Sequence, residues 1–415
     1  MSQSCRRNNL LLLLASLGLG FGLVEVGVRL LISSSEDGYG RVLGVELPPL
    51  RVFRHSVLPL EWSSEAAGRL FEDGPITFGD LYGHVREDPA LGYTARENAI
   101  SANGWWQSNG VGARRKHEVL GDASGPRLLV FGESFAHASR VRQEHAWASV
   151  LDSLCPEIEV VNFGVDGYSM AQSYLRYRAL GPKLEHDNVL FMFVPSVDLW
   201  RDLNTLRSLR GWSDLPVVPR FVLDNGSLRL IESPYRSLAE AVRGNQGGIS
   251  RRLQDHLNRY DRFYCSPMYD VPPLLGELML YKITAVAWCR VKLARLEAEL
   301  LKPESEAVRL TRAMFAALRL EAEENGRRFV LVLLPTRSDL NKLGRDEGHA
   351  ETLSELGRLF CSENECMDLT EPLATLPLEQ VDRGADGTHY GPATNRRIAE
   401  ILASRFACSG RVEKG

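Results

Sequence analysis

The sequence lacks the residue patterns typical of metal enzymes and of nucleic-acid-binding proteins. Its nine histidines form no His-Glu-x-x-His motif, and no spacing of cysteine with histidine indicates a zinc site. The formal net charge of −4 at pH 7 leaves no basic footprint for a nucleic acid, and no nucleic-acid-binding motif is present. Internal repeats and low-complexity linkers are absent as well. We therefore expect a globular protein of one large or two smaller domains, with no metal, cofactor or nucleic-acid partner.

The N-terminal segment is strongly apolar. The run from Leu10 to Val24 carries no charge, and Glu25 and Arg29 follow it. This run is short for a membrane-spanning helix, but residues 8–32 together are long enough if both charged residues lie near the membrane surface. The segment therefore predicts a transmembrane anchor.

Two alternatives to this anchor remain open. A cleaved signal peptide has a similar charged start and apolar middle, but no small-x-small cleavage site follows this run. A helix buried in the fold is the other. Arg6 and Arg7 precede the run and favour an N-terminus inside the cell. We expect a single-pass protein of the cytoplasmic membrane whose remaining chain is periplasmic or extracellular, with secretion after signal cleavage as the alternative.

The seven cysteines are compatible with that location. Cys361 and Cys366 are five positions apart, so a disulfide between them would close a small loop. The spacing of the other cysteines predicts no pairing.

Short apolar runs from residue 127 onward predict a parallel sheet. Four runs read as buried strands and a shorter one as a fifth: residues 127–131, 159–163, 189–194, 329–334 and 367–369. Apolar residues three and four positions apart predict helices over residues 169–181, 306–325 and 393–406. Strands that alternate with helices indicate an α/β fold with a doubly wound, flavodoxin-like parallel sheet and helices on both faces.

The stretch between the third and fourth strands looks like an insertion over one end of this sheet. Residues 220–231 predict a hairpin around Asn225-Gly226, and residues 274–301 predict a long helix. The predicted division is a cytoplasmic tip and membrane anchor (1–35), an extracytoplasmic pre-core segment (36–125), a first part of the core (126–205), an inserted hairpin and helical cap (206–305), a second part of the core (306–408) and a tail (409–415).

Ser134 directly follows the first predicted strand, in the sequence Gly132-Glu133-Ser134. The carboxyl ends of parallel strands open onto the crevice where such sheets bind ligands, so a nucleophile belongs there, although a serine that only caps the next helix would look the same. Asp386 and His389 precede the last predicted helix, three positions apart. This spacing lets both face one cleft, where the histidine takes the proton of a serine and the aspartate balances the imidazolium.

These segments resemble the SGNH (GDSL-like) hydrolase family, in particular its bacterial members with an N-terminal membrane helix. Gly132-Glu133-Ser134 is similar to the first family block, residues 162–168 (NFGVDGY) to the second, and residues 386–389 (DGTH) to the last. The resemblance implies a catalytic triad of Ser134, His389 and Asp386, with the serine oxygen within hydrogen-bond reach of the histidine. It also implies that the N–H groups of Ser134 and Gly167 bind the oxyanion.

The third family block departs from this pattern. The family usually has Gly-Asn-Asp after the third strand, and its asparagine donates to the oxyanion, whereas this chain has Pro195-Ser196-Val197-Asp198. Aligning Asp198 with the family aspartate places Val197 where the asparagine belongs, and a shift of one residue offers Ser196 instead. Further candidates for substrate binding are Asn162, Gln172, Asp198, Trp105 and Trp106.

We therefore expect a membrane-anchored, extracytoplasmic serine esterase or acyltransferase. Acyl esters of cell-envelope or exported polysaccharides are the expected substrate class, by analogy at the level of the fold. Because the block-three asparagine is missing, a weakly active or inactive binding or scaffold protein on the same fold is the alternative.

Overall fold

The computed structural model describes residues 3–34, 40–48, 84–101, 103–115, 117–119, 125–210, 217–245 and 249–406, with only the backbone given for residues 3–11, 14, 34, 238 and 242. The chain divides into two compact units. The first comprises Met1–Val52 and Asn245–Leu296, and the second comprises Phe53–Gly244 and Glu297–Gly415. Much of the predicted pre-core segment and the whole predicted tail lie outside the described residues.

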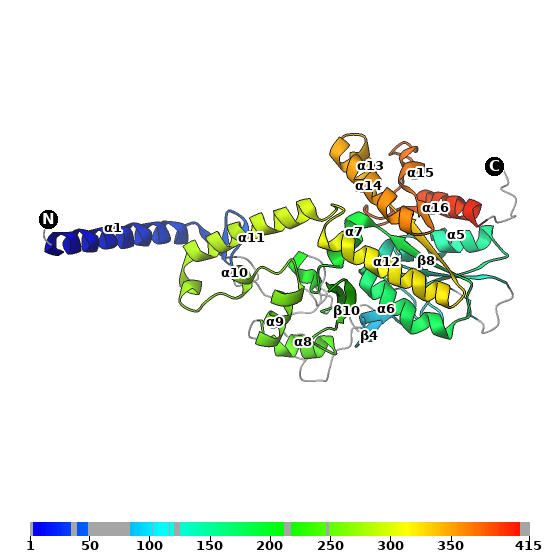
Figure 1. Cartoon of the computed structure of the whole chain (residues 1–415), viewed down its shortest axis with the longest axis horizontal. Coiled ribbons are helices and arrows are strands. Elements are labelled where there is room, and N and C mark those ends of the chain that lie inside the picture. The colour runs from blue at the N-terminus through cyan, green and yellow to red at the C-terminus, as the bar shows by residue number, and fades with distance from the viewer. Residues whose placement is uncertain are drawn as a thin grey trace. The chain divides into compact units, whose positions relative to one another are not determined.

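The first unit contains the predicted N-terminal helix and the long helix of the insertion (Figure 1). Glu25 accepts hydrogen bonds from the N–H groups of Met279 and Leu280, which belong to the first turn of the long helix. A disulfide joins Cys265 to Cys289. The helices and strands of this unit are α1 (Gln3–Arg29), β1 (Ile32–Ser34), β2 (Gly40–Val42), β3 (Val45–Glu46), α9 (Arg251–Tyr260), α10 (Ser266–Tyr269) and α11 (Met279–Glu299).

The membrane anchor predicted over residues 8–32 stays a prediction. The structure confirms a helix there, but no helix in the described part of the chain is both long and apolar enough to span a membrane. Part of the apolar run lies outside that description, because the side chains of residues 1–11 and 14 are not given. Glu25 was expected at the membrane surface, whereas its carboxylate caps α11 within the same unit.

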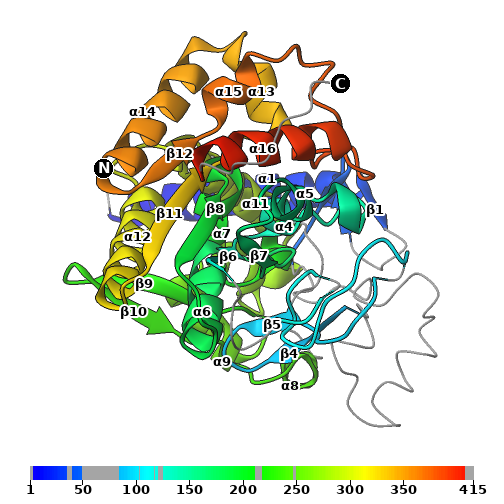
Figure 2. The same ribbon diagram turned by 90° about the vertical axis from the view of Figure 1, so that its right-hand side faces the viewer.

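The second unit is built on a sheet of five parallel strands, which confirms the predicted α/β fold with a parallel sheet (Figure 2). The strands lie in the order β12-β11-β8-β6-β7. After β6 the chain forms β7 on one side of it and then crosses to form β8 on the other side. The crevice at such a switch point, here between β6 and β8, is where open α/β sheets bind ligands. The strands are β6 (Arg127–Phe131), β7 (Glu159–Asn162), β8 (Asn188–Phe193), β11 (Arg328–Leu333) and β12 (Cys366–Asp368).

Helices cover both faces of this sheet, which is why its strands are apolar without interruption. Phe131 contacts Tyr177 of α6 (Met170–Leu180), and Phe193 contacts Phe315 of α12 (Glu306–Glu324), both edge to face. The strand residues adjacent to these two phenylalanines point to the opposite face of the sheet. On that face α5 (Trp147–Leu154) and α16 (Pro392–Arg405) pack together. The remaining helices are α4 (Ser134–His137), α7 (Pro195–Arg201), α8 (Leu238–Gly244), α13 (Arg337–Leu343), α14 (Glu347–Glu363) and α15 (Thr370–Ala374).

Two small antiparallel hairpins accompany the sheet. β9 (Arg220–Asp224) and β10 (Ser227–Ile231) confirm the predicted hairpin, and both of its turn residues, Asn225 and Gly226, have positive φ, as a tight hairpin turn requires. The other hairpin joins β4 (Val85–Asp88) to β5 (Gly92–Ala95). The predicted disulfide between Cys361 and Cys366 is also found.

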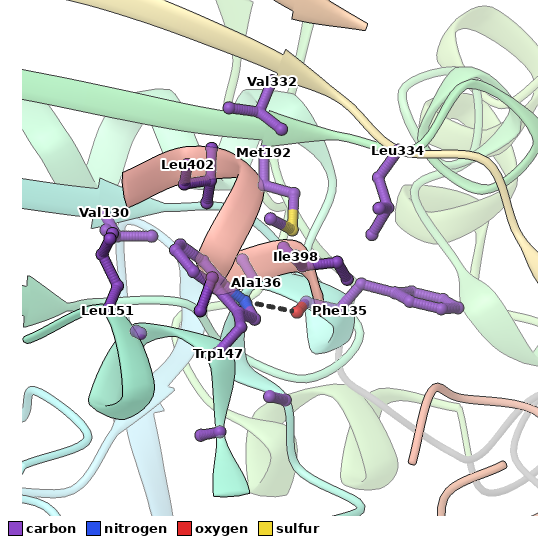
Figure 3. Close-up of a cluster of buried hydrophobic side chains, with 14 of the residues drawn as sticks. Val130, Phe135, Ala136, Trp147, Leu151, Met192, Val332, Leu334, Ile398 and Leu402 are labelled. Carbon is purple, nitrogen blue, oxygen red and sulfur yellow. Dashed lines mark hydrogen bonds between the residues drawn. The ribbon is translucent and has the colours of Figure 1, made fainter. Parts of the chain in front are cut away.

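The core beneath α4 is organised around Trp147, which is fully buried (Figure 3). It packs in one apolar cluster with Val130, Met192 and Ile398, and its ring N–H donates to the carbonyl of Phe135 at 3.1 Å. This bond ties α5 to the short helix that begins with Ser134. The core therefore supports the segment on which the candidate nucleophile lies.

Trp147→Ala should lower the free energy of unfolding by about 3–5 kcal/mol, because it opens a large cavity and leaves the Phe135 carbonyl without its donor. Chemical denaturation monitored by circular dichroism measures the change. Trp147→Phe is the matched control, since it retains most of the apolar volume and should cost clearly less. Equal losses in the two variants would contradict a packing role for the indole.

Candidate active site

The turn after β6 places Ser134 at the carboxyl edge of the sheet. Gly132 has φ 151°, and a Cβ at this position would lie 2.6 Å from that of Ala136 and 2.9 Å from the carbonyl oxygen of Met192. Only glycine fits so close an approach. The side chain of Glu133 then caps α4 by accepting the N–H of Phe135, so Ser134 is the first residue of this helix.

Ser134, His389 and Asp386 lie together in one hydrogen-bonded chain. The Oγ of Ser134 is 2.7 Å from Nε2 of His389, and Nδ1 of His389 is 2.5 Å from Oδ2 of Asp386. With its proton on Nδ1, the imidazole donates to the aspartate and accepts the serine hydroxyl. The structure thus brings the three residues together in one hydrogen-bonded chain, while their catalytic role stays a prediction.

The loop that carries Asp386 and His389 is held by its own backbone. Oδ1 of Asp386 accepts the N–H groups of Thr388 and His389, each at 3.0 Å, and the carbonyl of His389 accepts the N–H of Gly384 at 2.7 Å. The ring of Phe135 packs against that of His389, with centroids 4.6 Å apart. The imidazole is therefore fixed from several sides, as a general base must be.

The charge of Asp386 persists at low pH. Partial burial raises the pKa of this carboxyl, but the N–H groups of His389 and Thr388 and the His389 ring outweigh burial and lower the pKa to about 2. Arg140 adds an ion pair, with Nε 3.3 Å from Oδ2 of Asp386. A carboxylate that stays ionised can balance an imidazolium throughout the pH range in which a histidine acts as a base.

The predicted oxyanion donors lie in two turns at the same edge of the sheet. The N–H of Ser134 belongs to the first turn of α4, and Gly167 has φ 75° in the turn after β7. Tyr93 donates its hydroxyl to the carbonyl of Asp166 at 2.7 Å, and Arg201 donates to the carbonyl of Tyr168 at 3.1 Å. The carbonyl groups of Asp166 and Tyr168, the residues on either side of Gly167, are therefore anchored. The oxyanion role of Gly167 and Ser134 stays a prediction.

The residues of the third block make contacts within the fold. Ser196 donates its hydroxyl to Oδ2 of Asp339 at 2.7 Å, so its one proton is committed to that carboxylate and not to an oxyanion. Val197 is half-buried and packs against the apolar core. Asp198 is fully buried and accepts the N–H of Val194 at 2.8 Å. Ser196 is therefore a poor candidate for the missing donor, and its oxyanion role stays a prediction.

Val197→Asn should raise kcat for an activated ester by about tenfold, because it introduces a side-chain donor to the oxyanion. Removing such a donor from an enzyme that has it lowers kcat by about a hundred- to a thousandfold. Ser196→Ala should leave kcat unchanged, since its hydroxyl serves Asp339. Steady-state kinetics with para-nitrophenyl acetate compare both variants with the wild type. A loss of rate in Ser196→Ala together with no gain in Val197→Asn would show that Ser196 is the donor.

Four of the five candidates for substrate binding are buried and make internal contacts. Asn162 donates to the carbonyl of Ala136 and accepts the N–H of Gly164, and Gln172 donates to the carbonyl of Leu91. Trp106 packs edge-on against the ring of His137. The contacts described for Asn162, Gln172, Asp198 and Trp106 are all internal to the fold, so the substrate-binding role of these residues stays a prediction. Trp105 is half-buried beneath the guanidinium of Arg142.

Two arginines at the site were missed in the sequence. Arg140 pairs with Asp386, and Arg201 donates to the carboxylate of Glu133 at 3.2 Å. The position of Arg140 six residues after the nucleophile carried no signal. Arg201 is in the same helix as Asp198, but nothing in its spacing linked it to Glu133.

Comparison with known proteins finds resemblance in structure only. No protein-family model matches the sequence, and no curated protein matches it either. A lipolytic protein of the G-D-S-L family from Desulfitobacterium hafniense DCB-2 is 13% identical, with 68% of this chain and 99% of that one covered and a TM-score of 0.31. The α/β hydrolase LAE5 from the metagenome of Lake Arreo is 13% identical, with 69% and 97% covered and a TM-score of 0.36. The acetylxylan esterase Axe2 from Geobacillus stearothermophilus is 13% identical, with 71% and 100% covered and a TM-score of 0.32. Likenesses of this size carry no argument about function, which has to follow from the geometry of the site.

Proposed function

We propose that this protein is a serine hydrolase of the SGNH type, which cleaves or transfers acyl esters through an acyl-enzyme on Ser134. One observation carries the proposal: the hydrogen-bonded chain from Ser134 through His389 to Asp386, with distances of 2.7 and 2.5 Å. This arrangement supplies a nucleophile, a general base and a group that orients the base.

The first half of the reaction forms the acyl-enzyme. The Oγ of Ser134 attacks the acyl carbonyl carbon while its proton passes to Nε2 of His389, and Asp386 balances the imidazolium. The N–H groups of Ser134 and Gly167 bind the oxyanion of the tetrahedral intermediate. The intermediate collapses when the ester oxygen leaves with the proton that His389 returns.

The second half releases the acyl group. His389 removes a proton from the incoming nucleophile, which attacks the acyl carbon and frees Ser134. Water gives hydrolysis and a sugar hydroxyl gives transfer, so the two activities differ only in this step. Only the relative access of water and an acceptor alcohol separates an esterase from an acyltransferase.

The proposal extends to location and substrate class. The apolar run over residues 10–24, preceded by Arg6 and Arg7, supports a membrane anchor with the catalytic unit outside the cytoplasm. Acyl esters on cell-envelope or exported polysaccharides are the substrates that such a location would offer. The disulfide between Cys361 and Cys366 also fits an oxidising compartment.

A fluorophosphonate probe tests the proposed chemistry, because it reacts with a serine only when a base activates that serine. Full-length wild-type protein should be labelled, and peptide mapping should place the label on Ser134. Ser134→Ala should not be labelled. Absence of label on folded wild-type protein would favour the alternative of a binding or scaffold protein, which the missing block-three asparagine supports.

A further inference from the structure

The carboxylate of Glu133 contacts the candidate nucleophile directly. Glu133 is fully buried, and its Oε2 lies 2.6 Å from Oγ of Ser134. Its Oε1 accepts the N–H of Phe135 at 2.8 Å, which is an ordinary helix cap. The contact with Ser134 is additional to that cap, so a structural role at the start of α4 does not account for it.

The Ser134 hydroxyl therefore lies between two acceptors, Glu133 and Nε2 of His389, but it has one proton to donate. When His389 is neutral, the hydroxyl donates to Nε2, which is the arrangement that leads to reaction. When His389 is protonated, Nε2 donates to the serine oxygen and the hydroxyl turns to Glu133. Glu133 thus completes the hydrogen bonds of the protonated, inactive form.

Charged residues flank the hydrogen-bonded series of Glu133, Ser134 and His389 on both sides. Arg201 is almost fully buried and donates from one nitrogen to both Glu133 Oε2 and the Tyr168 carbonyl, beside the predicted oxyanion donor Gly167. Asp198 also faces Glu133, and burial, together with the Glu133 charge, raises the pKa of Asp198 well above its usual range.

On the far side of His389 stand Asp386 and Arg140, which pair with each other. Their charges are unchanged by any substitution at Glu133. The effect of the Glu133 charge on His389 can therefore be isolated experimentally. Two consecutive hydrogen bonds, of 2.6 and 2.7 Å, link the carboxylate to the imidazole through Ser134, so the two groups are close enough to interact electrostatically.

We infer that Glu133, held by Arg201, is a positioning residue that competes with His389 for the Ser134 hydroxyl and thereby sets the lower pH limit of activity. This inference rests on the proposed function, since it presupposes that Ser134 is the nucleophile. The pair acts through Ser134 and His389 and does not touch the substrate.

The test is the pH dependence of kcat/KM for para-nitrophenyl acetate in the full-length protein. Glu133→Gln keeps the shape and removes the charge, so the acid limb should move to lower pH by about one unit. Glu133→Asp keeps both the charge and the helix cap, and its limb should stay where the wild type has it. A purely structural role predicts instead a lower rate at every pH with no movement of the limb.

Glu133→Gln leaves a buried guanidinium without its charged partner, which can prevent folding. The double variant Glu133→Gln, Arg201→Met removes both charges and leaves none unpaired. Its acid limb should move in the same direction, because the described hydrogen bonds link Arg201 to His389 through Glu133 and Ser134. Melting curves show which of the two variants is folded. The pH profile of the folded variant then tests the role of Glu133.

The outcomes separate the two proposals. If wild type and Ser134→Ala hydrolyse the ester equally, the proposed function is wrong. If Ser134→Ala is inactive and the acid limb of a folded Glu133→Gln or double variant coincides with that of wild type, only the inference about Glu133 is overturned.

Discussion

Ser134→Ala should lower kcat for para-nitrophenyl acetate by about a millionfold, to the level of the residual catalysis that binding groups alone provide. The alanine removes the only atom that can form the acyl-enzyme, while His389 and Asp386 remain. Burst kinetics of para-nitrophenol release check the result, since the burst reports formation of an acyl-enzyme.

Ser139→Ala is the matched control for this variant. Ser139 is also a buried serine near α4, and its hydroxyl has no hydrogen-bond partner among the described residues. Its removal should leave kcat within about twofold of the wild type, because the substitution deletes one small hydroxyl and breaks no described hydrogen bond. A comparable loss in both variants would indicate damage to α4 and not removal of a nucleophile.

Asp386→Asn should lower kcat by about ten-thousandfold at neutral pH with little change in KM, because an amide favours the wrong tautomer of His389 and does not balance the imidazolium. Single-turnover measurements of acylation give the rate directly. Asp346→Asn is a suitable control, since Asp346 caps α14 in the same unit and has no contact with the triad in the described structure. A loss smaller than tenfold in Asp386→Asn would contradict the orienting role of Asp386.

The lowered pKa of Asp386 also fixes the sign of its effect on stability. Its pKa of about 2 lies below the value of about 3.9 expected for an unfolded chain. Asp386 therefore stabilises the fold fully above the unfolded value, and this contribution is lost as the pH falls towards 2. Between pH 4 and 7 the charge of Asp386 is constant, so an acid limb of activity in that window does not come from Asp386.

Local patterns were sufficient for much of the fold. Four of the five strands contain buried apolar runs because both faces of the sheet are covered, and such runs are visible without knowing what covers them. The hairpin around Asn225-Gly226 follows from two residues that tolerate positive φ. Ser134, Asp386 and His389 were also found in this way, since each occupies a short motif at the end of a strand or the start of a helix.

Only the tertiary structure decided which polar residues support the site and which merely hold the fold. Ser196 was a candidate oxyanion donor in the sequence, but Asp339, 143 positions away, takes its proton. Glu133 was only one residue of a motif in the sequence, whereas the structure shows that it contacts Ser134 and that Arg201, 68 positions away, holds its carboxylate. The pairing of Cys265 with Cys289 likewise had no signal in its spacing. The sequence by itself determines what lies within a few residues of a strand end, because backbone geometry fixes those distances. The partner of a buried charge or hydroxyl depends on how distant segments pack, and that is set only when the chain folds.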